Sequence, residues 1–196
     1  NVQSDVGEIG SLPGSTVSAD KVTYTGELAG NFNMSTDDVT LITRTSGDVV
    51  INYTGTGPLT LRQVYVLAGS LIVNTPGDLV VMDARLLSNN DAYRIQLNAG
   101  GNVTLGYLEA GDYAATELEA AAIRTARGLA ADAPLTSLQS ISITAGGSIR
   151  EIGAGDDSVD LVAGTLTLVA GTGISGIQFA ANTLVSASAT TGSISL

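Results

Sequence analysis

The stretch Asp160-Leu-Val-Ala-Gly-Thr-Leu-Thr-Leu-Val-Ala-Gly-Thr-Gly-Ile174 alternates aliphatic residues with small polar ones between glycines. A period of two residues is typical of a β-strand with one buried face, because successive side chains of a strand point to opposite sides. The pattern predicts that Leu166 and Leu168 point into a core and that Thr165 and Thr167 point outward. Glycine at each corner permits a tight bend of the chain.

The same unit recurs through much of the chain. It begins at Gly47, Gly57, Gly69, Gly77 and Gly101, and it resumes near residues 140, 147, 164, 182 and 192. The first five starts are separated by 10, 12, 8 and 24 residues, so alternate starts repeat at about 20–24 residues. This spacing is typical of one coil of a solenoid, in which stacked coils bury a continuous aliphatic column.

The repeat predicts an all-β chain folded as a parallel β-helix, or β-solenoid, with one inserted α-helix. A β-sandwich is the alternative, because it also contains short strands at regular spacing. A sandwich requires hairpin turns, for which Asn-Gly and Asp-Gly are the strongest signals, and the sequence contains neither dipeptide. The solenoid is therefore the favoured interpretation.

Two regions interrupt the repeat and define the expected organisation. Residues 1–20 are expected to form an initial segment or cap, or a strand paired with a neighbour. Residues 21–196 are expected to form the β-solenoid, interrupted by a helical insertion at residues 109–137. The insertion contains an alanine-rich segment that ends at Gly128, a typical helix stop. We interpret it as a lateral brace along the rod, with a binding element as the alternative.

Composition excludes several classes of function. Eight basic residues stand against 19 acidic ones, for a net charge of −11, whereas affinity for nucleic acid requires Lys and Arg to neutralise phosphates. The chain contains no cysteine and no histidine, which excludes disulfides, thiolate or imidazole metal sites and Ser-His-Asp catalysis. The apolar runs are too short to span a bilayer, and residues 1–20 lack the pattern of a signal peptide.

A glycine-rich acidic turn is the best candidate for a metal site. The segment Gly153-Ala-Gly-Asp-Asp-Ser-Val-Asp160 supplies carboxylates as hard oxygen ligands, and it partly resembles the calcium-binding nonapeptide of RTX proteins. We therefore consider a calcium site at Asp156, Asp157 and Asp160, with a solvated turn as the favoured alternative and no cofactor expected otherwise. A second acidic turn, Ser35-Thr-Asp-Asp38, is a weaker candidate.

Other polar residues supply the types needed for action on carbohydrate. Parallel β-helices include polysaccharide lyases and hydrolases, and Asp83 with Arg85, or Asp91 with Arg94, provide suitable pairs. Solvated or weakly paired surface charges are the simpler explanation. Tyrosines that shared one face would suit stacking on sugars, although isolated tyrosines are usually half-buried strand residues. The six tyrosines are Tyr24, Tyr53, Tyr65, Tyr93, Tyr107 and Tyr113.

The segments Ser140-Ile-Ser-Ile-Thr-Ala-Gly-Gly-Ser-Ile149 and 160–174 resemble the repeats of filamentous-haemagglutinin-like bacterial exoproteins, as does Gly101-Asn-Val-Thr-Leu-Gly106. The resemblance implies a right-handed parallel β-helix, export from a Gram-negative-type cell and a role in adhesion or surface fibres. The chain lacks the Asn-Pro-Asn motifs of the family's secretion domain, so an interior or terminal segment of such a protein is expected.

These observations predict a structural or adhesive module of a bacterial cell-surface or secreted protein, without catalysis. A subunit of a self-assembling extracellular fibre is the alternative, and a calcium-dependent carbohydrate-acting enzyme is the second. The expected partners are other copies of the chain or adjoining repeats of a larger one, and host or matrix carbohydrate or protein. Neither a nucleic acid nor a membrane span is expected, and the expected location is extracellular or at the bacterial surface.

Overall fold

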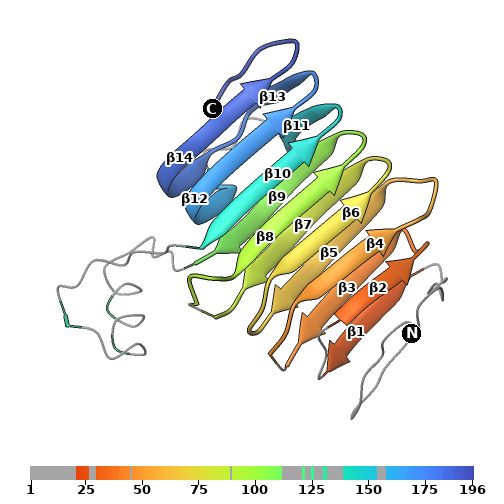
Figure 1. Cartoon of the computed structure of the whole chain (residues 1–196), viewed down its shortest axis with the longest axis vertical. Helices are drawn as coiled ribbons and strands as arrows, with labels where there is room; N and C mark the ends of the chain where they lie inside the picture. Colours follow the sequence, from red (N-terminus) through yellow and green to blue (C-terminus); the bar gives the residue numbers. More distant parts are fainter. Residues whose placement is uncertain are drawn as a thin grey trace.

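The computed structural model describes residues 21–26, 30–44, 46–88, 90–111, 121, 125, 130–131, 139–153 and 158–196. In these residues, fourteen strands form one curled sheet (Figure 1), and every pair of neighbouring strands is parallel. The predicted all-β class is confirmed. The alternative of a β-sandwich built from hairpins is wrong, because hairpins would pair their strands antiparallel.

The strands are β1 (Val22–Gly26), β2 (Gly30–Met34), β3 (Asp38–Thr43), β4 (Val49–Tyr53), β5 (Leu59–Val66), β6 (Leu71–Thr75), β7 (Leu79–Leu86), β8 (Arg94–Ala99), β9 (Val103–Ala110), β10 (Ser140–Ala145), β11 (Ser148–Glu151), β12 (Leu161–Ala170), β13 (Gly173–Ser175) and β14 (Phe179–Ala189).

The sheet consists of two runs of strands that meet at β12. One run contains β1, β3, β5, β7 and β9, and the other contains β2, β4, β6, β8 and β10. The first part of β12, Leu161–Ala163, pairs with β9, and its second part, Thr165–Ala170, pairs with β10. The sheet therefore curls around one interior. Beyond the junction, β11 pairs with β9 and β13, and β14 pairs with β12.

Strand register confirms the period seen in the sequence. Leu59 pairs with Leu79 and Leu79 with Val103, which are separations of 20 and 24 residues (79 − 59 and 103 − 79). The other run gives similar values, because Leu71 pairs with Ile95, 24 residues later (95 − 71). Each circuit of the chain thus places a strand beside its equivalent in the preceding repeat.

The interior is filled by the alternate residues of each strand. Leu166 and Leu168 have no exposed surface, whereas Thr165 and Thr167 are partly exposed, as predicted. The core is almost entirely aliphatic, and a single cluster of buried residues extends from Tyr24 to Ile177. Because each strand alone would leave its aliphatic face exposed, the cluster depends on the pairing of neighbouring strands around the interior.

The turns between β8 and β9, β10 and β11, and β12 and β13 stack so closely that they require glycine. A Cβ atom placed on Gly146 would lie 2.1 Å from the carbonyl oxygen of Gly100, and one placed on Gly171 would lie 1.9 Å from that of Gly146. These contacts are with backbone atoms, which cannot move aside without breaking the ladder. Glycine therefore recurs at these turns because the backbones of successive turns approach each other closely.

The start of β8 does not follow the glycine spacing of the repeat. β8 begins at Arg94 directly after Tyr93 rather than after a glycine, and it lies between the repeat starts at Gly77 and Gly101. Its alternation of buried Ile95 and Leu97 is nevertheless regular. The interval between the repeat starts Gly77 and Gly101 is therefore 24 residues because β8 lies within it and has no glycine directly before it.

The predicted initial segment, residues 1–20, lies outside the described residues. Most of the predicted insertion at 109–137 also lies outside them, although β9 continues through Ala110, and Ala121 and Thr125 have helical backbone. In the described part of the chain, no helix has the length and apolar character needed to cross a bilayer.

Candidate functional site

The densest group of interacting polar side chains lies on the outer surface of β5, β7 and β9. We call it the Arg85 cluster, and it comprises Tyr65, Asp83, Arg85, Tyr107 and Glu109. Strand register brings these residues together, because Tyr65 pairs with Arg85, Arg85 with Glu109, and Asp83 with Tyr107. All five are partly exposed, and they alternate with core residues on their strands.

Arg85 is the centre of this cluster. Its Nε donates to Asp83 Oδ1 at 2.8 Å, its Nη2 donates to Asp83 Oδ2 at 3.1 Å, and its Nη1 lies 3.7 Å from Glu109 Oε2. The guanidinium carbon lies 4.7 Å from the ring centroid of Tyr107 and 5.5 Å from that of Tyr65. The cation therefore lies between two carboxylates and two aromatic rings, a favourable environment for a guanidinium.

The hydroxyl groups of both tyrosines are also engaged. Tyr65 donates to Asp83 Oδ2 at 2.6 Å, and Tyr107 donates to Glu109 Oε2 at 3.0 Å. Burial raises the pKa of both phenols, and the neighbouring carboxylates raise it further. Burial also raises the pKa of the Glu109 carboxyl, although the hydrogen bond from Tyr107 and the charge of Arg85 oppose that shift.

In a lyase site the Arg would act as a general base, and Arg85 does not suit that role. The hydrogen bonds to Asp83 raise the pKa of Arg85, which keeps the guanidinium protonated and unsuited to act as a base. Each charged group has a partner of opposite sign within the cluster. The arrangement links three strands through side chains and presents a mixed polar and aromatic surface.

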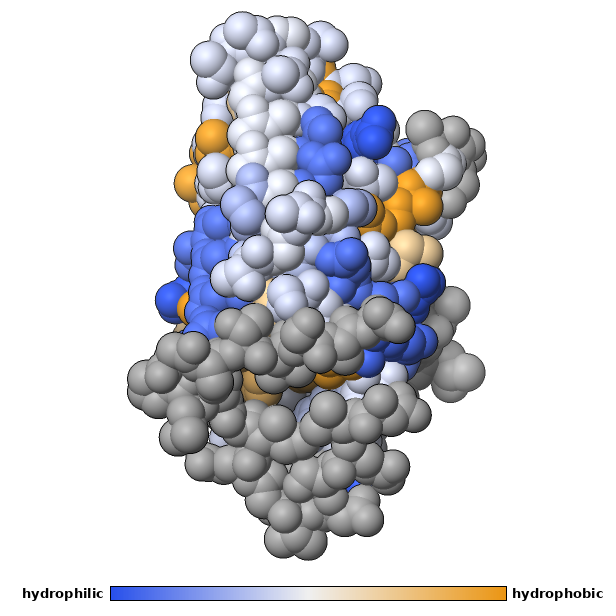
Figure 2. Space-filling view, turned by 90° about the vertical axis from the view of Figure 1, so that its right-hand side faces the viewer, coloured by the Kyte–Doolittle hydropathy of each residue, from blue (hydrophilic) through white to orange (hydrophobic). Residues whose placement is uncertain are grey.

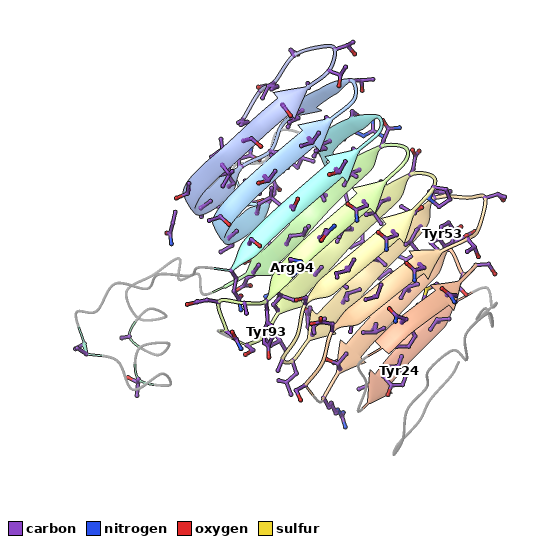
Figure 3. All side chains as sticks on the ribbon, viewed as in Figure 1. Tyr24, Tyr53, Tyr93 and Arg94 are labelled. Atoms are coloured by element: carbon purple, nitrogen blue, oxygen red, sulfur yellow. The ribbon has the colours of Figure 1, made fainter. Side chains whose placement is uncertain are left out.

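The other tyrosines do not join this surface. Tyr24 and Tyr53 are each 3% exposed and belong to the core, and Tyr93 packs against the core from the start of β8 (Figure 3). Tyr113 lies outside the described residues. Of the six tyrosines, Tyr65 and Tyr107 are thus the pair that the structure places on one outer face, and both rings contact Arg85.

A ladder of asparagines follows the outer face of β2, β4, β6 and β8. Asn52 Nδ2 donates to Asn33 Oδ1 at 3.3 Å, Asn74 to Asn52 at 2.9 Å, and Asn98 to Asn74 at 2.8 Å. Each amide lies in register with the next, so the hydrogen bonds run along the stacking direction. This ladder is not among the features predicted from the sequence, although an Asn at the same strand position in successive repeats is its signal.

The residues predicted to bind calcium are only partly described. Asp156 and Asp157 lie outside the described residues. Asp160 is 2% exposed, and its Oδ2 accepts a hydrogen bond from the backbone N–H of Gln178 at 2.8 Å. Asp160 is therefore a buried residue rather than part of a solvated turn. Within the described ranges, no three His, Cys, Asp or Glu side chains are grouped to hold a metal ion.

The weaker acidic turn is held by neighbours from other strands. Asp37 accepts a hydrogen bond from the hydroxyl of Tyr53, and Asp38 Oδ2 lies 2.6 Å from Arg62 Nε. Burial raises the pKa of Tyr53 to about 12, and the hydrogen bond and charge of Asp37 add to the shift. These carboxylates thus have structural partners.

The second predicted pair is not brought together. Asp91 is exposed in the turn before β8, and Arg94 is exposed at the start of that strand (Figure 3). The ion pairs of the described residues join Arg62 with Asp38, and Arg85 with Asp83 and Glu109. Asp91 and Arg94 form none among them.

The surface in Figure 2 shows hydrophobic residues as small separate spots between wider hydrophilic and neutral areas. The coloured part of this face therefore displays no broad apolar patch of the kind that marks many protein interfaces. Comparison of the chain with family models, with curated proteins and with solved structures finds no match.

Proposed function

We propose that the chain is a segment of a right-handed parallel β-solenoid that serves as a structural and adhesive module of a bacterial cell-surface or secreted protein, without catalytic activity. The parallel sheet and its register of 20–24 residues support the solenoid. Right-handed winding is the expectation because connections between parallel strands of one sheet are almost always right-handed. The resemblance to filamentous-haemagglutinin-like repeats supports the location and the role.

One observation carries this proposal, namely a single column of core residues that crosses successive coils in register. Each member is aliphatic and pairs with the next. Such stacking makes a stiff rod whose length grows with the number of coils, which suits a protein that must project from a surface. The column consists of Val49, Leu71, Ile95, Ile141, Leu166 and Leu184.

The outer faces support an adhesive role. The asparagine ladder and the Arg85 cluster present amides, a guanidinium, carboxylates and phenols from rigid strands, and such groups bind the hydroxyls of carbohydrates and the polar groups of proteins. Because strands hold these side chains at fixed spacing, a ligand meets a preorganised surface.

Binding by beads coated with the purified chain tests the adhesive role. We expect beads to bind cultured epithelial cells or arrayed matrix proteins and polysaccharides, and we expect the Arg85→Ala variant to bind less if the cluster takes part. Asp91→Asn, an exposed change away from the cluster, is the matched control. Absence of binding to every surface would contradict adhesion, and cleavage of any arrayed polysaccharide in the presence of calcium would favour the enzyme.

A subunit of an extracellular fibre is a second candidate, and the edge of β14 favours it. Within the described residues, β14 pairs with β12 alone, and its own side chains Leu184 and Val185 are 38% and 62% exposed. An open strand edge with apolar side chains is a template for a further strand. That strand would come from a second copy of the chain or from adjoining repeats of a longer one.

Light scattering coupled to size exclusion, with electron microscopy of the same samples, separates the two candidates. Filaments that lengthen with protein concentration, and that Val185→Lys abolishes, would support the fibre. Monomers at every concentration would contradict the fibre and favour a module that does not assemble with itself. Lys at this edge is chosen because a charge on an exposed strand opposes pairing without altering the core.

A further inference from the structure

One core position of the sheet is occupied by a carboxylate. Glu151, the last residue of β11, pairs with Leu105 of β9, and Leu105 pairs with Val81 of β7. Leu105 and Val81 are fully buried, and Glu151 is 5% exposed. The period of β11 also turns Glu151 inward, because Ile149 is buried and Arg150 between them is exposed. A charged residue therefore stands where the preceding coils have aliphatic ones.

Among the residues that the structure describes, the carboxylate of Glu151 has no hydrogen-bond partner. Both Oε1 and Oε2 are buried without a hydrogen bond. The neighbouring cation, Arg150, directs its Nε to Thr104 Oγ1 at 3.3 Å on the outer surface. The ion pairs of the described residues lie on β3, β5, β7 and β9, and none of them includes a residue of β11. An isolated buried carboxylate costs several kcal/mol, so the folded protein must compensate it.

Neither oxygen of Glu151 has a hydrogen-bond partner. A bound cation compensates both oxygens at once.

A second buried carboxylate lies against the same segment of chain. Glu151 Oε2 lies 3.2 Å from the position that a Cβ on Gly176 would take, and Asp160 Oδ2 accepts from the N–H of Gln178 at 2.8 Å. Both carboxylates therefore contact the three-residue segment 176–178. Between Glu151 and Asp160 the sequence contains no lysine or arginine. Two acidic groups thus enter the interior, while the nearest basic residue in sequence, Arg150, is exposed and directs its Nε to Thr104.

We propose that Glu151 is an interior ligand of a calcium ion, with Asp160 as the second carboxylate of the same site. The side-chain donors of Glu151 and Asp160 are oxygens only, which selects hard cations over transition metals. Calcium accepts six to eight oxygens in irregular geometry, so that backbone carbonyls and waters complete its shell, whereas magnesium requires a near-ideal octahedron. The site shares Asp160 with the sequence-based hypothesis, and Glu151 is the residue that the structure adds.

Calcium titration of the full chain after dialysis against EDTA tests this assignment. Isothermal titration calorimetry is expected to show a single calcium site, and the unfolding temperature is expected to rise by about 5–10 °C at calcium concentrations about 100 times Kd. Magnesium at equal concentration is expected to shift it less.

Two substitutions of Glu151 locate the ion. Glu151→Gln removes the negative charge. Glu151→Leu introduces the same residue as its register partner Leu105, so this variant is expected to remain folded for the test. Both are expected to lose the calcium-dependent shift, whereas Asp91→Asn, at an exposed turn, keeps it. The proposal is overturned if the unaltered chain shows no heat of calcium binding and no calcium-dependent shift of the unfolding temperature. It is also overturned if either Glu151 variant binds calcium with unchanged Kd, or if magnesium shifts the unfolding temperature equally.

Discussion

Two leucines that pair with each other show how the middle of the sheet differs from its C-terminal end. Leu166 in β12 and Leu184 in β14 are direct register partners in the same core column. Leu166 is completely buried, whereas Leu184 is 38% exposed. The difference arises because β12 has neighbours on both sides and β14 has one. A residue of this repeat is therefore buried by the adjacent coils more than by its own.

The outer surface shows the same contrast. The asparagine ladder ends at Asn98, because the next residue in register is Thr144 of β10, followed by Val169 of β12. Val169 is 37% exposed and contributes no amide hydrogen bond. On this face, the N-terminal strands are thus linked by an amide ladder as well as by backbone, whereas the ladder does not continue into β10 and β12.

The largest expected effect comes from truncating the two paired leucines. Leu166→Ala should lower the free energy of unfolding by about 2–5 kcal/mol, because it leaves a cavity in a fully packed column. Leu184→Ala should cost about 1 kcal/mol, since that side chain is already partly hydrated. Urea denaturation followed by circular dichroism measures both. Equal costs would contradict the comparison, since they would mean that another part of the protein covers β14.

The stacked glycine turns provide the next test. Gly146→Ala should cost about 1–3 kcal/mol, because its Cβ would lie 2.1 Å from the carbonyl oxygen of Gly100. Gly77→Ala is the matched control, since the nearest atom to its Cβ would be the Gly57 oxygen at an ordinary 3.6 Å. Thermal unfolding compares the two variants. A loss at Gly77 as large as that at Gly146 would disprove close backbone approach as the cause.

Breaking the asparagine ladder should have a smaller effect. Asn74→Ala removes one hydrogen bond to Asn52 and one from Asn98, so we expect a loss of about 1–2 kcal/mol from the free energy of unfolding. Ser142→Ala, on the same outer face but outside the ladder, serves as the control and should be nearly neutral. Chemical denaturation is again the measurement, and equal effects of the two substitutions would show that the ladder adds no stability.

The smallest effect at ordinary pH concerns the buried phenols. Burial raises the pKa of Tyr53 to about 12 in the folded chain, against about 10 in an unfolded one. The folded state therefore holds the proton more tightly, and this contribution to stability is complete below pH 10 and is lost as the pH rises towards 12. Tyr65 and Tyr107 shift in the same direction.

Urea denaturation at intervals between pH 8 and pH 11 tests this expectation. We expect the free energy of unfolding to fall above pH 10, and we expect Tyr53→Phe to make the fall less steep without removing it. A pH dependence identical to that of the unaltered chain would show that Tyr53 ionises alike in both states.

The sequence predicts the strands well where small polar and aliphatic residues alternate between glycines. Leu166, Leu168 and the register of 20–24 residues follow from that pattern alone. It fails at β8, where Arg94 takes the place of a corner glycine, because tertiary pairing imposes the strand without the local signal. Local periodicity also does not predict that β12 connects the two runs of strands. The connection depends on tertiary pairing, because the first part of β12 pairs with β9 and the second part pairs with β10.

The candidate sites are predicted less completely than the fold. Asp83 and Arg85 are adjacent on one face of a strand, so their pairing follows from a period of two. Tyr65, Tyr107 and Glu109 join them only through the register of three strands, which requires the exact length of every turn. Glu151 is different, because the alternation of Ile149, Arg150 and Glu151 already points its side chain inward, and a carboxylate at a core position is a signal that the sequence carries.

The register also tolerates a large change in chain length at one corner. Ile95 and Ile141 are direct partners although they are 46 residues apart (141 − 95), whereas the next pair in that column, Ile141 and Leu166, is 25 apart (166 − 141). The additional residues leave the ladder between β8 and β10 unbroken. In the evolution of such a repeat, new sequence can therefore be acquired after Ala110 at little energetic cost, and the same position offers protein engineers a place to graft a foreign peptide or domain onto the rod.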